Sequence, residues 1–398
     1  MHVRHLSLTN FRLYARLELD LPTGLSIIQG DNAQGKTSLL EALYFLATAH
    51  SMHSNIDRQV FRWGAEEESP YPFVMLKADV QRRDGAHLVE LAMQKGDGTR
   101  LKKEIKVDRV SKRGADLVGQ LAVVLFVPGD VELTAGPPSA RRDFLDAALS
   151  QVDGAYVRHL DKFNKALAQR NALLRQAQER RIDPDELAVW DDQLVPNGVQ
   201  VALRRRDLVA QLAQLAVPIH RELTSNLEYL QIVYQPNFDP DAPPAANTPI
   251  QAGLSFAQAF ENYDAEDLEK AYRAILKTRA AEEMARSVTL VGPHRDELRF
   301  KANGIDIGEF GSRGQQRSAI LSLKLAQVAW MRERLGDEPI LLLDEVLAEL
   351  DPNRRRCLLN RIGSSHQTII TSTDINRFDA AFVQSATLFN VHSGIVHN

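Results

Sequence analysis

The sequence has only one cysteine, Cys357, among its 398 residues, so it can form neither an internal disulfide nor a Cys-x-x-Cys metal site. It has no apolar run of the roughly 18 residues that a membrane span needs. It also has no basic-then-apolar leader with a cleavage site, and its eleven histidines show no spacing typical of metal ligands. These absences predict a cytoplasmic protein without a membrane segment.

An excess of positive charge is also absent. The chain carries 48 Lys and Arg against 52 Asp and Glu, which gives a net charge of −4. Because proteins that bind nucleic acids are often basic, this balance is mild evidence against such a partner, and local clusters must decide. The hydrophobic fraction of 44% and the charged fraction of 25% are ordinary for a globular protein. The length predicts about two domains.

A phosphate-binding loop is present at residues 30–37, which fit the pattern G-x-x-x-x-G-K-[ST]. A short apolar run at residues 25–29 predicts a buried strand before it. Apolar residues at helical spacing follow in residues 39–46. Backbone N–H groups of such a loop, together with the helix N-terminus, attract phosphate. We expect ATP to contact Gly30, Asp31, Asn32, Ala33, Gln34, Gly35, Lys36, Thr37 and Ser38.

A second motif is the unbroken apolar run at residues 340–343, which ends in Asp344 and Glu345. Such a run predicts a central parallel strand, and ligands of parallel sheets bind beyond the carboxyl ends of the strands. Lys36 is expected to hold the β- and γ-phosphates, and Thr37 and Asp344 to bind Mg²⁺. Glu345 is expected to act as the general base that polarises the attacking water. Lys36 and Glu345 are thus the candidate catalytic residues.

With residues 312–316 (Ser-Arg-Gly-Gln-Gln) as a signature, the sequence resembles the RecF family of bacterial recombination-mediator ATPases, which carry ABC-type heads. The P-loop alone is shared by many ATPases, whereas the combination of motifs is specific. The resemblance runs from residue 8 to residue 374. Further matching segments are residues 8–12, 126–133, 136–138 with Arg141 and Arg142, 190–194, 292–296, 349–351 and 371–374.

The resemblance implies a site shared between two subunits. Ser312, Gly314 and Gln315 are implied to contact ATP bound to the other subunit, and Asp351 to lie near the interface. Thr373 occupies the switch position, where many ABC ATPases have histidine. The sequence departs from the family at Gly129, where an acidic residue is usual. It also lacks a clear Q-loop glutamine, for which Asp130 or a neighbour is the candidate substitute.

The resemblance further implies an ATP-dependent DNA-binding protein that repairs single-strand gaps by recombination. It also implies roles in replication maintenance and the SOS response. ATP binding would drive head-to-head dimerisation, and slow, DNA-stimulated hydrolysis to ADP and phosphate would release the dimer. The implied partners are double-stranded DNA, junctions of single- and double-stranded DNA, and RecR with RecO.

Three other functions remain open from the sequence. One is another soluble ABC-type ATPase subunit, as in transport or translation, that is not coupled to DNA; the signature and the helical insertion fit it poorly. Another is a nuclease-linked ATPase, although no additional acidic metal cluster is visible. The third is a platform that binds ATP without hydrolysis, against which Glu345 argues.

One basic cluster could contact DNA. Residues 94–113 hold eight Lys and Arg against three acids and predict a hairpin of residues 87–94 and 101–107 around a turn at 96–98. A basic sheet edge can bind phosphates without reading bases. Alternatively, these lysines only protect an edge strand from aggregation. The candidate DNA contacts are Lys95, Arg100, Lys102, Lys103, Lys106 and Arg109.

The predicted fold class is α/β: a P-loop ABC-type ATPase head of mixed sheets and helices, with an inserted α-helical arm. We expect an N-terminal lobe at residues 1–130, a mainly helical arm at 131–286, and a C-terminal lobe at 287–398. In the arm, a break at residues 181–184 separates two long helices that should pair antiparallel, with a kink at Pro196. The Pro-rich residues 236–252 predict a loop to which no chemistry is assigned. The turn at residues 292–296 could meet a phosphate or a partner, or serve the structure alone.

Overall fold

The computed structural model describes residues 1–50, 57–65, 71–95, 101–178, 184–238, 240, 263–362 and 365–397. They form two compact units, Met1–Asp130 with Lys324–Asn398, and Val131–Leu323. The expected division at residues 130/131 and 286/287 stays a prediction, because compactness alone does not define domains that fold independently. The two units are described in turn.

The first unit contains a six-stranded sheet in the order β15-β14-β3-β13-β12-β8. From β14 to β8 all neighbours are parallel, and only β15 is antiparallel to its neighbour. Every residue of β12, β13 and β8 is buried, as central parallel strands require, so the strand expected at residues 340–343 is confirmed. The strands are β3 (Gly24–Gln29), β8 (Val123–Phe126), β12 (Ile340–Asp344), β13 (Gln367–Ser372), β14 (Ala386–His392) and β15 (Ile395–His397).

The second sheet of this unit is antiparallel, in the order β2-β1-β4-β5-β6-β7. One face is apolar, as the alternation of buried and open positions along β4 shows, and the other carries charged residues. The hairpin expected from the basic cluster is confirmed as β5 and β6, whereas its turn at 96–98 lies outside the described residues. The strands are β1 (His2–Phe11), β2 (Tyr14–Asp20), β4 (Phe73–Arg82), β5 (Gly85–Lys95), β6 (Leu101–Val107) and β7 (Val110–Lys112).

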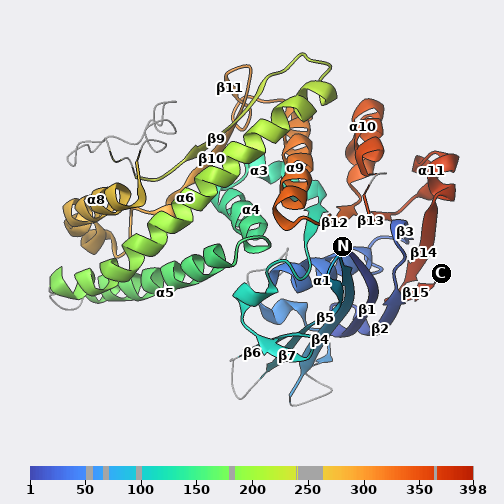
Figure 1. Ribbon diagram of the computed structural model, residues 1–398, viewed down its shortest axis with the longest axis horizontal. Helices are drawn as coiled ribbons and strands as arrows, with labels where there is room; N and C mark the ends of the chain where they lie inside the picture. The colour runs from blue at the N-terminus through green and yellow to red at the C-terminus, as the bar shows by residue number, and fades with distance from the viewer. Residues whose placement is uncertain are drawn as a thin grey trace. The chain divides into compact units, whose positions relative to one another are not determined.

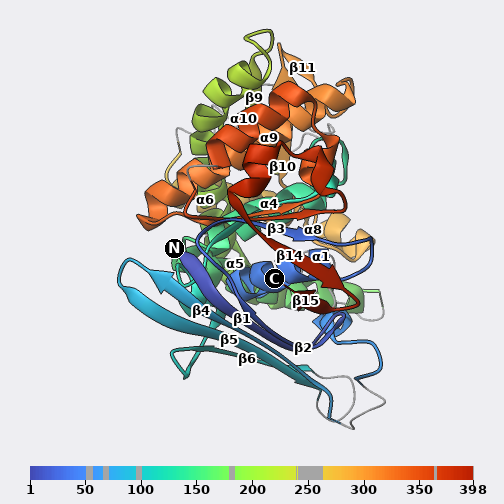
Figure 2. The same ribbon diagram turned by 90° about the vertical axis from the view of Figure 1, so that its right-hand side faces the viewer.

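Helix α1 (Lys36–Thr48) joins the two sheets of the first unit. It contacts β8, β12 and β13 on one side and β4 and β5 on the other, and Figure 2 shows it between the sheets. Its apolar residues, including Leu39, Leu43 and Phe45, are almost fully buried. The helix expected after the P-loop is therefore present, and it forms the core of this unit. Helices α10 (Pro352–Ile362) and α11 (Ala380–Gln384) also belong to the unit.

The second unit is built on two long helices, α5 (Gly154–Gln176) and α6 (Pro184–Leu223), which pack against each other (Figure 1). Arg170 of α5 donates to Asp191 near the start of α6, at 2.6 Å. Arg204, later in α6, donates to Asp153 just before α5, at 2.9 Å. The pair is therefore antiparallel, as expected. Pro196, where a kink is expected, lies inside the 40-residue helix α6 and does not end it.

Shorter elements complete the second unit. Helices α3 (Glu132–Ala135), α4 (Pro138–Ser150) and α8 (Ala265–Arg286) accompany the long pair. A three-stranded antiparallel sheet that we did not predict consists of β9 (Leu230–Gln235), β10 (Glu297–Ala302) and β11 (Ile305–Asp306). Helix α9 (Arg313–Leu335) begins in this unit and passes into the first one after Leu323.

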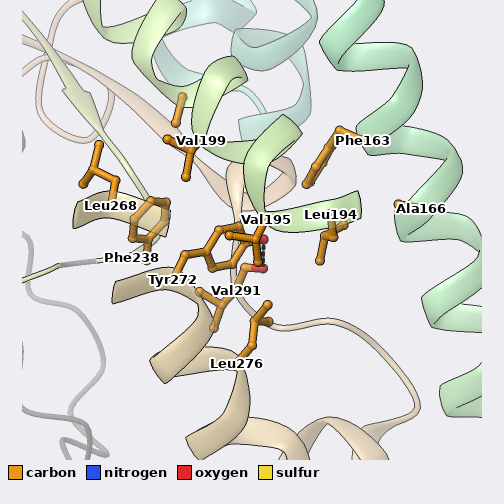
Figure 3. Close-up of a cluster of buried hydrophobic side chains, with 11 residues drawn as sticks. Phe163, Ala166, Leu194, Val195, Val199, Phe238, Leu268, Tyr272, Leu276 and Val291 are labelled. Atoms are coloured by element: carbon orange, nitrogen blue, oxygen red, sulfur yellow. Dashed lines mark hydrogen bonds between the residues drawn. The ribbon is translucent and has the colours of Figure 1, made fainter. Parts of the chain in front are cut away.

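The core of the second unit surrounds Tyr272 of α8 (Figure 3). Its ring stacks on Phe238, with 4.8 Å between ring centroids, and its hydroxyl donates to the Val291 carbonyl at 2.9 Å. A Cβ at Gly292, where φ is +130°, would lie only 2.0 Å from the Tyr272 hydroxyl. Only glycine therefore fits at the start of the 292–296 turn.

The rest of this turn is also held inside the unit. Asp296 is 1% exposed, accepts from Asn237 N at 2.8 Å and from the Tyr234 hydroxyl, and lies 3.5 Å from Arg205. His294 Nε2 lies 3.1 Å from the Thr289 carbonyl, and its buried Nδ1 has no partner among the described residues. Of these residues only Arg295 is exposed. The contacts favour the structural interpretation of this motif.

His294 should make stability depend on pH. Burial lowers its pKa to about 4 from the ordinary 6.5, so the unfolded chain takes up the proton first as pH falls. The contribution of neutral His294 to the free energy of unfolding is full above pH 6.5 and declines as the pH falls toward 4. The pKa shift of His294 therefore predicts that the free energy of unfolding falls by about 2 kcal/mol between pH 7.5 and pH 5. His294→Gln keeps a donor for Thr289 but does not titrate. Urea unfolding should therefore show a smaller loss in the variant, and identical pH slopes would contradict this assignment.

Candidate nucleotide site

The P-loop lies between β3 and α1, and two close backbone approaches fix its shape. A Cβ at Gly35, where φ is +114°, would lie 2.8 Å from the Tyr14 hydroxyl, which donates to the Gly35 carbonyl at 3.0 Å. A Cβ at Gly30 would lie 2.4 Å from the Val391 carbonyl of β14. Both glycines of the motif are therefore required by their neighbours, while Asp31 to Ala33 are exposed.

The turn between β14 and β15 also supports the loop. Ser393 N donates to Gln34 Oε1 at 2.6 Å, and Gly394 N donates to the Gln34 carbonyl at 3.1 Å. The side chain of Gln34 is thus engaged by residues near the C-terminal end of the chain. We expect only the backbone of Gln34 to face a phosphate.

The structure brings the two predicted catalytic residues together. Lys36, 4% exposed, lies with its Nζ 3.1 Å from Glu345 Oε1 and donates to the carbonyls of Gly30 and Asp31 at 2.8 and 2.9 Å. Glu345 follows β12 directly and has a left-handed backbone with φ of +53°. Such strain in a non-glycine residue is typical of functional sites.

The Asp344 carboxylate accepts hydrogen bonds from two hydroxyl groups. Thr37 Oγ1 lies 3.0 Å from both carboxylate oxygens, and Thr371 Oγ1 donates to Asp344 Oδ1 at 2.7 Å. Thr371 is 1% exposed and also accepts from Glu345 N at 3.1 Å. It therefore orients both acidic residues of the motif. The sequence places Thr371 only within the matching segment 371–374 and does not predict this role, which depends on the register between β12 and β13.

The donor set around Asp344 fits Mg²⁺. Carboxylate and hydroxyl oxygens are hard ligands, and Mg²⁺ is usually held by one or two carboxylates together with substrate phosphates. In the part of the chain that the structure describes, no group of three or more His, Cys, Asp or Glu could hold a metal. Thr37 and Asp344 would hold the ion together with phosphate oxygens and water.

A hollow beside Glu345 contains the predicted switch residue. It is lined by Glu345, Leu347, Arg355, Thr371, Ser372, Thr373 and Phe378. Asp351 caps α10, because it accepts from Asn353 N and Arg354 N at 3.0 Å each, and these bonds hold the pKa of its carboxyl below the usual range. The roles of Asp351 and Thr373 toward a second subunit stay predictions.

The Q-loop candidate, Asp130, is held by its own unit. It lies 2.9 Å from Lys324 Nζ and accepts from Val127 N at 2.8 Å. Lys324 in turn donates to the Leu125 carbonyl at 2.8 Å. These bonds connect the end of β8 to α9, and whether Asp130 replaces the Q-loop glutamine stays a prediction.

The signature lies in the second unit, at the start of α9. Ser312 N donates to Gln315 Oε1 at 3.0 Å, and Gln315 N donates to Ser312 Oγ at 3.2 Å. This is a capping box, which explains why serine and glutamine stand three residues apart. Ser312 is exposed, and Gly314 is half-buried in the first turn.

The candidate DNA contacts do not share one face. Lys103 lies over the Phe45 ring, 4.7 Å from its centroid, and reaches the Ala49 carbonyl at the end of α1. Lys102 and Lys106 occupy the opposite face, where Lys106 lies 3.4 Å from Glu104. Lys95 is half-buried, Arg109 is exposed in the turn after β6, and Arg100 lies outside the described residues. The cluster is thus divided between two faces and partly neutralised.

Comparison with known proteins decides the family. A model described as the RecF/RecN/SMC N-terminal domain matches residues 2–397. The DNA replication and repair protein RecF of Chloroflexus aurantiacus is 41% identical over 408 residues, which cover 100% of this chain and 99% of that protein. The corresponding protein of Herpetosiphon aurantiacus is 38% identical with the same coverage. The chain belongs to the RecF family.

A solved structure supports the fold. The recombination mediator protein RecF with ATP, from the RecFOR pathway, shares 27% identity and a TM-score of 0.82, covering 100% of this chain and 97% of that one. The expected ABC-type head with a helical insertion is therefore confirmed for this RecF-family chain. None of the helices that the structure describes combines the length and apolar composition needed to cross a membrane.

Thr371→Val should separate nucleotide binding from hydrolysis. The variant keeps the volume but removes the donor to Asp344 and the acceptor for Glu345 N–H. We expect ATP hydrolysis to fall by roughly 10- to 100-fold, the usual effect of losing a group that orients metal ligands. Thr371→Ser should keep most of the rate. Turnover and ATP affinity, measured for both variants, check this; a Val variant with the wild-type rate would show that Thr371 does not orient the site.

Proposed function

We propose that this chain is an ATP-binding recombination mediator of the RecF type that acts in DNA replication and repair. The observation that carries the proposal is the approach of Lys36 to Glu345, at 3.1 Å, beside an Asp344 that is held by Thr37. Residues more than 300 positions apart form one phosphate-binding and hydrolytic site. Membership of the RecF family supports the same function.

Each residue has a defined part in hydrolysis. Lys36 and the loop N–H groups hold the phosphates, and Glu345 accepts a proton from the attacking water. Thr371 fixes the backbone from which Glu345 projects. Thr37 and Asp344 would hold Mg²⁺, which would neutralise part of the phosphate charge. The chain is thus a slow ATPase that produces ADP and phosphate.

A second copy completes the site. Ser312, Gly314 and Gln315 contact the γ-phosphate bound to the partner, with Asp351 and Thr373 at the interface. The exposure of Ser312 supports this role. ATP stabilises the head-to-head dimer because it is bound by both subunits only in that state, and hydrolysis releases them.

The DNA structures and protein partners that we propose are those that the resemblance to the family implies. The chain acts at single-strand gaps, where it binds double-stranded DNA and junctions with single strands and works with RecR and RecO. It also serves replication maintenance and the SOS response, in the cytoplasm. Lys102, Lys106 and Arg109 contact DNA phosphates, whereas Lys103 stabilises α1 instead and Lys95 lies on the same face of the sheet as Lys103.

ATP hydrolysis should increase when duplex DNA is added. The experiment measures steady-state rates with and without DNA, using Glu345→Gln as the blank. The double variant Lys102→Glu and Lys106→Glu should keep the DNA-free rate and lose the stimulation, because it reverses two phosphate contacts. A wild-type rate indifferent to DNA would favour an ABC-type ATPase that is not coupled to DNA. Stimulation retained in the double variant would place the DNA site elsewhere, as on Arg158, Lys162 and Lys165 of α5.

Ser312→Arg should allow ATP binding and prevent dimerisation, because the bulky cation occupies the place of the partner's γ-phosphate. Sedimentation with ATP measures the dimer, and a fluorescent ATP analogue measures binding. Glu345→Gln is the positive control, since it should retain the dimer. A Ser312→Arg variant that still dimerises with ATP would exclude the two-subunit site.

A further inference from the structure

A buried histidine contacts a carboxylate at the end of the long helix α6. His220, in its last turn, is fully buried, and its Nε2 lies 3.1 Å from Glu228 Oε2. Glu228 stands in the segment between α6 and β9 and is half-buried. The family motifs do not include either residue, and neither belongs to the ATP site described above.

The other oxygen of this carboxylate reaches the signature. Glu228 Oε1 accepts from Gln315 Nε2 at 3.1 Å. The amide oxygen of Gln315 accepts from Ser312 N at 3.0 Å, and Gln315 N donates to Ser312 Oγ. A chain of hydrogen bonds therefore runs from His220 through Glu228 and Gln315 to Ser312.

His220 also contacts α9 directly, at a second point. His220 Nδ1 lies 3.1 Å from Ser322 Oγ, and Ser322 Oγ donates to the Ser318 carbonyl at 2.7 Å. His220 is thus held between Glu228 and Ser322 through its two ring nitrogens. Gln315 and Ser322 are seven residues apart and share one face of α9.

The chemistry of Glu228 determines which way the Gln315 amide points. An amide can exchange its oxygen and NH₂ by rotation, and neighbours decide the orientation. An ionised carboxylate only accepts, so Glu228 requires the NH₂ of Gln315 on its side. The amide oxygen is then directed to Ser312 N–H and forms the capping box. A reversed amide would place NH₂ against N–H and break the cap.

We propose that Glu228 and His220 are positioning residues for the signature: they fix the Gln315 amide and thereby the Ser312 hydroxyl that meets the partner's ATP. The proposal rests on the two-subunit site proposed above. It assigns to the end of α6 a direct part in assembling the ATP-bound dimer. Neither residue touches the nucleotide of its own subunit.

The test compares Glu228→Ala with Asp207→Ala in the full chain. Asp207 is an exposed acid on α6, paired only with the adjacent Arg206 as far as the described contacts show, and it serves as the control. Glu228→Ala should weaken the ATP-dependent dimer roughly tenfold and lower turnover by a similar factor, the effect of losing one charge-assisted hydrogen bond. ATP binding to the isolated subunit should stay at the wild-type value. Asp207→Ala should resemble wild type in all three measurements.

Two further variants show whether the effect passes through Gln315. The ATP-dependent dimer of the double variant Glu228→Ala with Gln315→Ala should be no weaker than that of Gln315→Ala alone. Both substitutions break the same series of hydrogen bonds. Glu228→Gln keeps the volume but offers an NH₂ group as well as an oxygen, and it should give an intermediate loss with an unchanged unfolding midpoint. Additive losses in the double variant would overturn the proposal.

The outcomes separate this proposal from the proposed function. If Ser312→Arg blocks the dimer while Glu228→Ala and Glu228→Gln dimerise and hydrolyse ATP like wild type, the positioning role is wrong and the two-subunit site stands. If Ser312→Arg leaves the dimer intact, the two-subunit site itself fails. If Glu228→Ala loses ATP binding together with dimerisation, Glu228 supports the fold rather than the signature, and the proposal is overturned.

Discussion

The geometry of the nucleotide site depends on the Asp344 carboxylate. Asp344 accepts hydrogen bonds from Thr37 at the start of α1 and from Thr371 at the end of β13. The parallel register makes this possible, because it sets Asp344 beside Thr371, and Thr371 beside Ile28 at the end of β3. Three segments that are distant in sequence thus end at one edge of the sheet. The positions of Lys36 and Glu345 follow from that alignment.

The second unit stabilises its long helices with buried charges as well as apolar packing. Arg170 meets Asp191 and Glu283, and Arg205 meets Asp146. Removing one partner of such a pair typically costs about 3–5 kcal/mol, because the other charge remains buried. The segment 190–194 supplies Asp191, and the segment 292–296 supplies Asp296, 3.5 Å from Arg205, and the glycine beside Tyr272. The described contacts of both segments thus hold the second unit together, which favours a structural part for them.

The sequence was informative where a local pattern determines a local structure. The P-loop, the helix after it and the apolar strand before Asp344 could all be predicted from contiguous residues. The role of Thr371 could not, because it arises from strand register. The sheet containing β9 was not predicted, and the alternation of buried and half-buried positions along residues 230–235 is visible only in the structure. Lys102 and Lys103 had to point to opposite faces of a strand, so the division of the basic cluster was also available from the sequence.

Strand β3, which leads into the P-loop, pairs only with strands that lie far from it in the sequence, as far as the described residues show. Its two neighbours are β13 and β14, both supplied by residues 367–392. The turn after β14 then holds Gln34. During synthesis, β3 emerges early and waits for more than 300 residues before its hydrogen-bonding partners exist. A nascent chain therefore cannot complete the sheet around the P-loop until residues 367–392 have been synthesised.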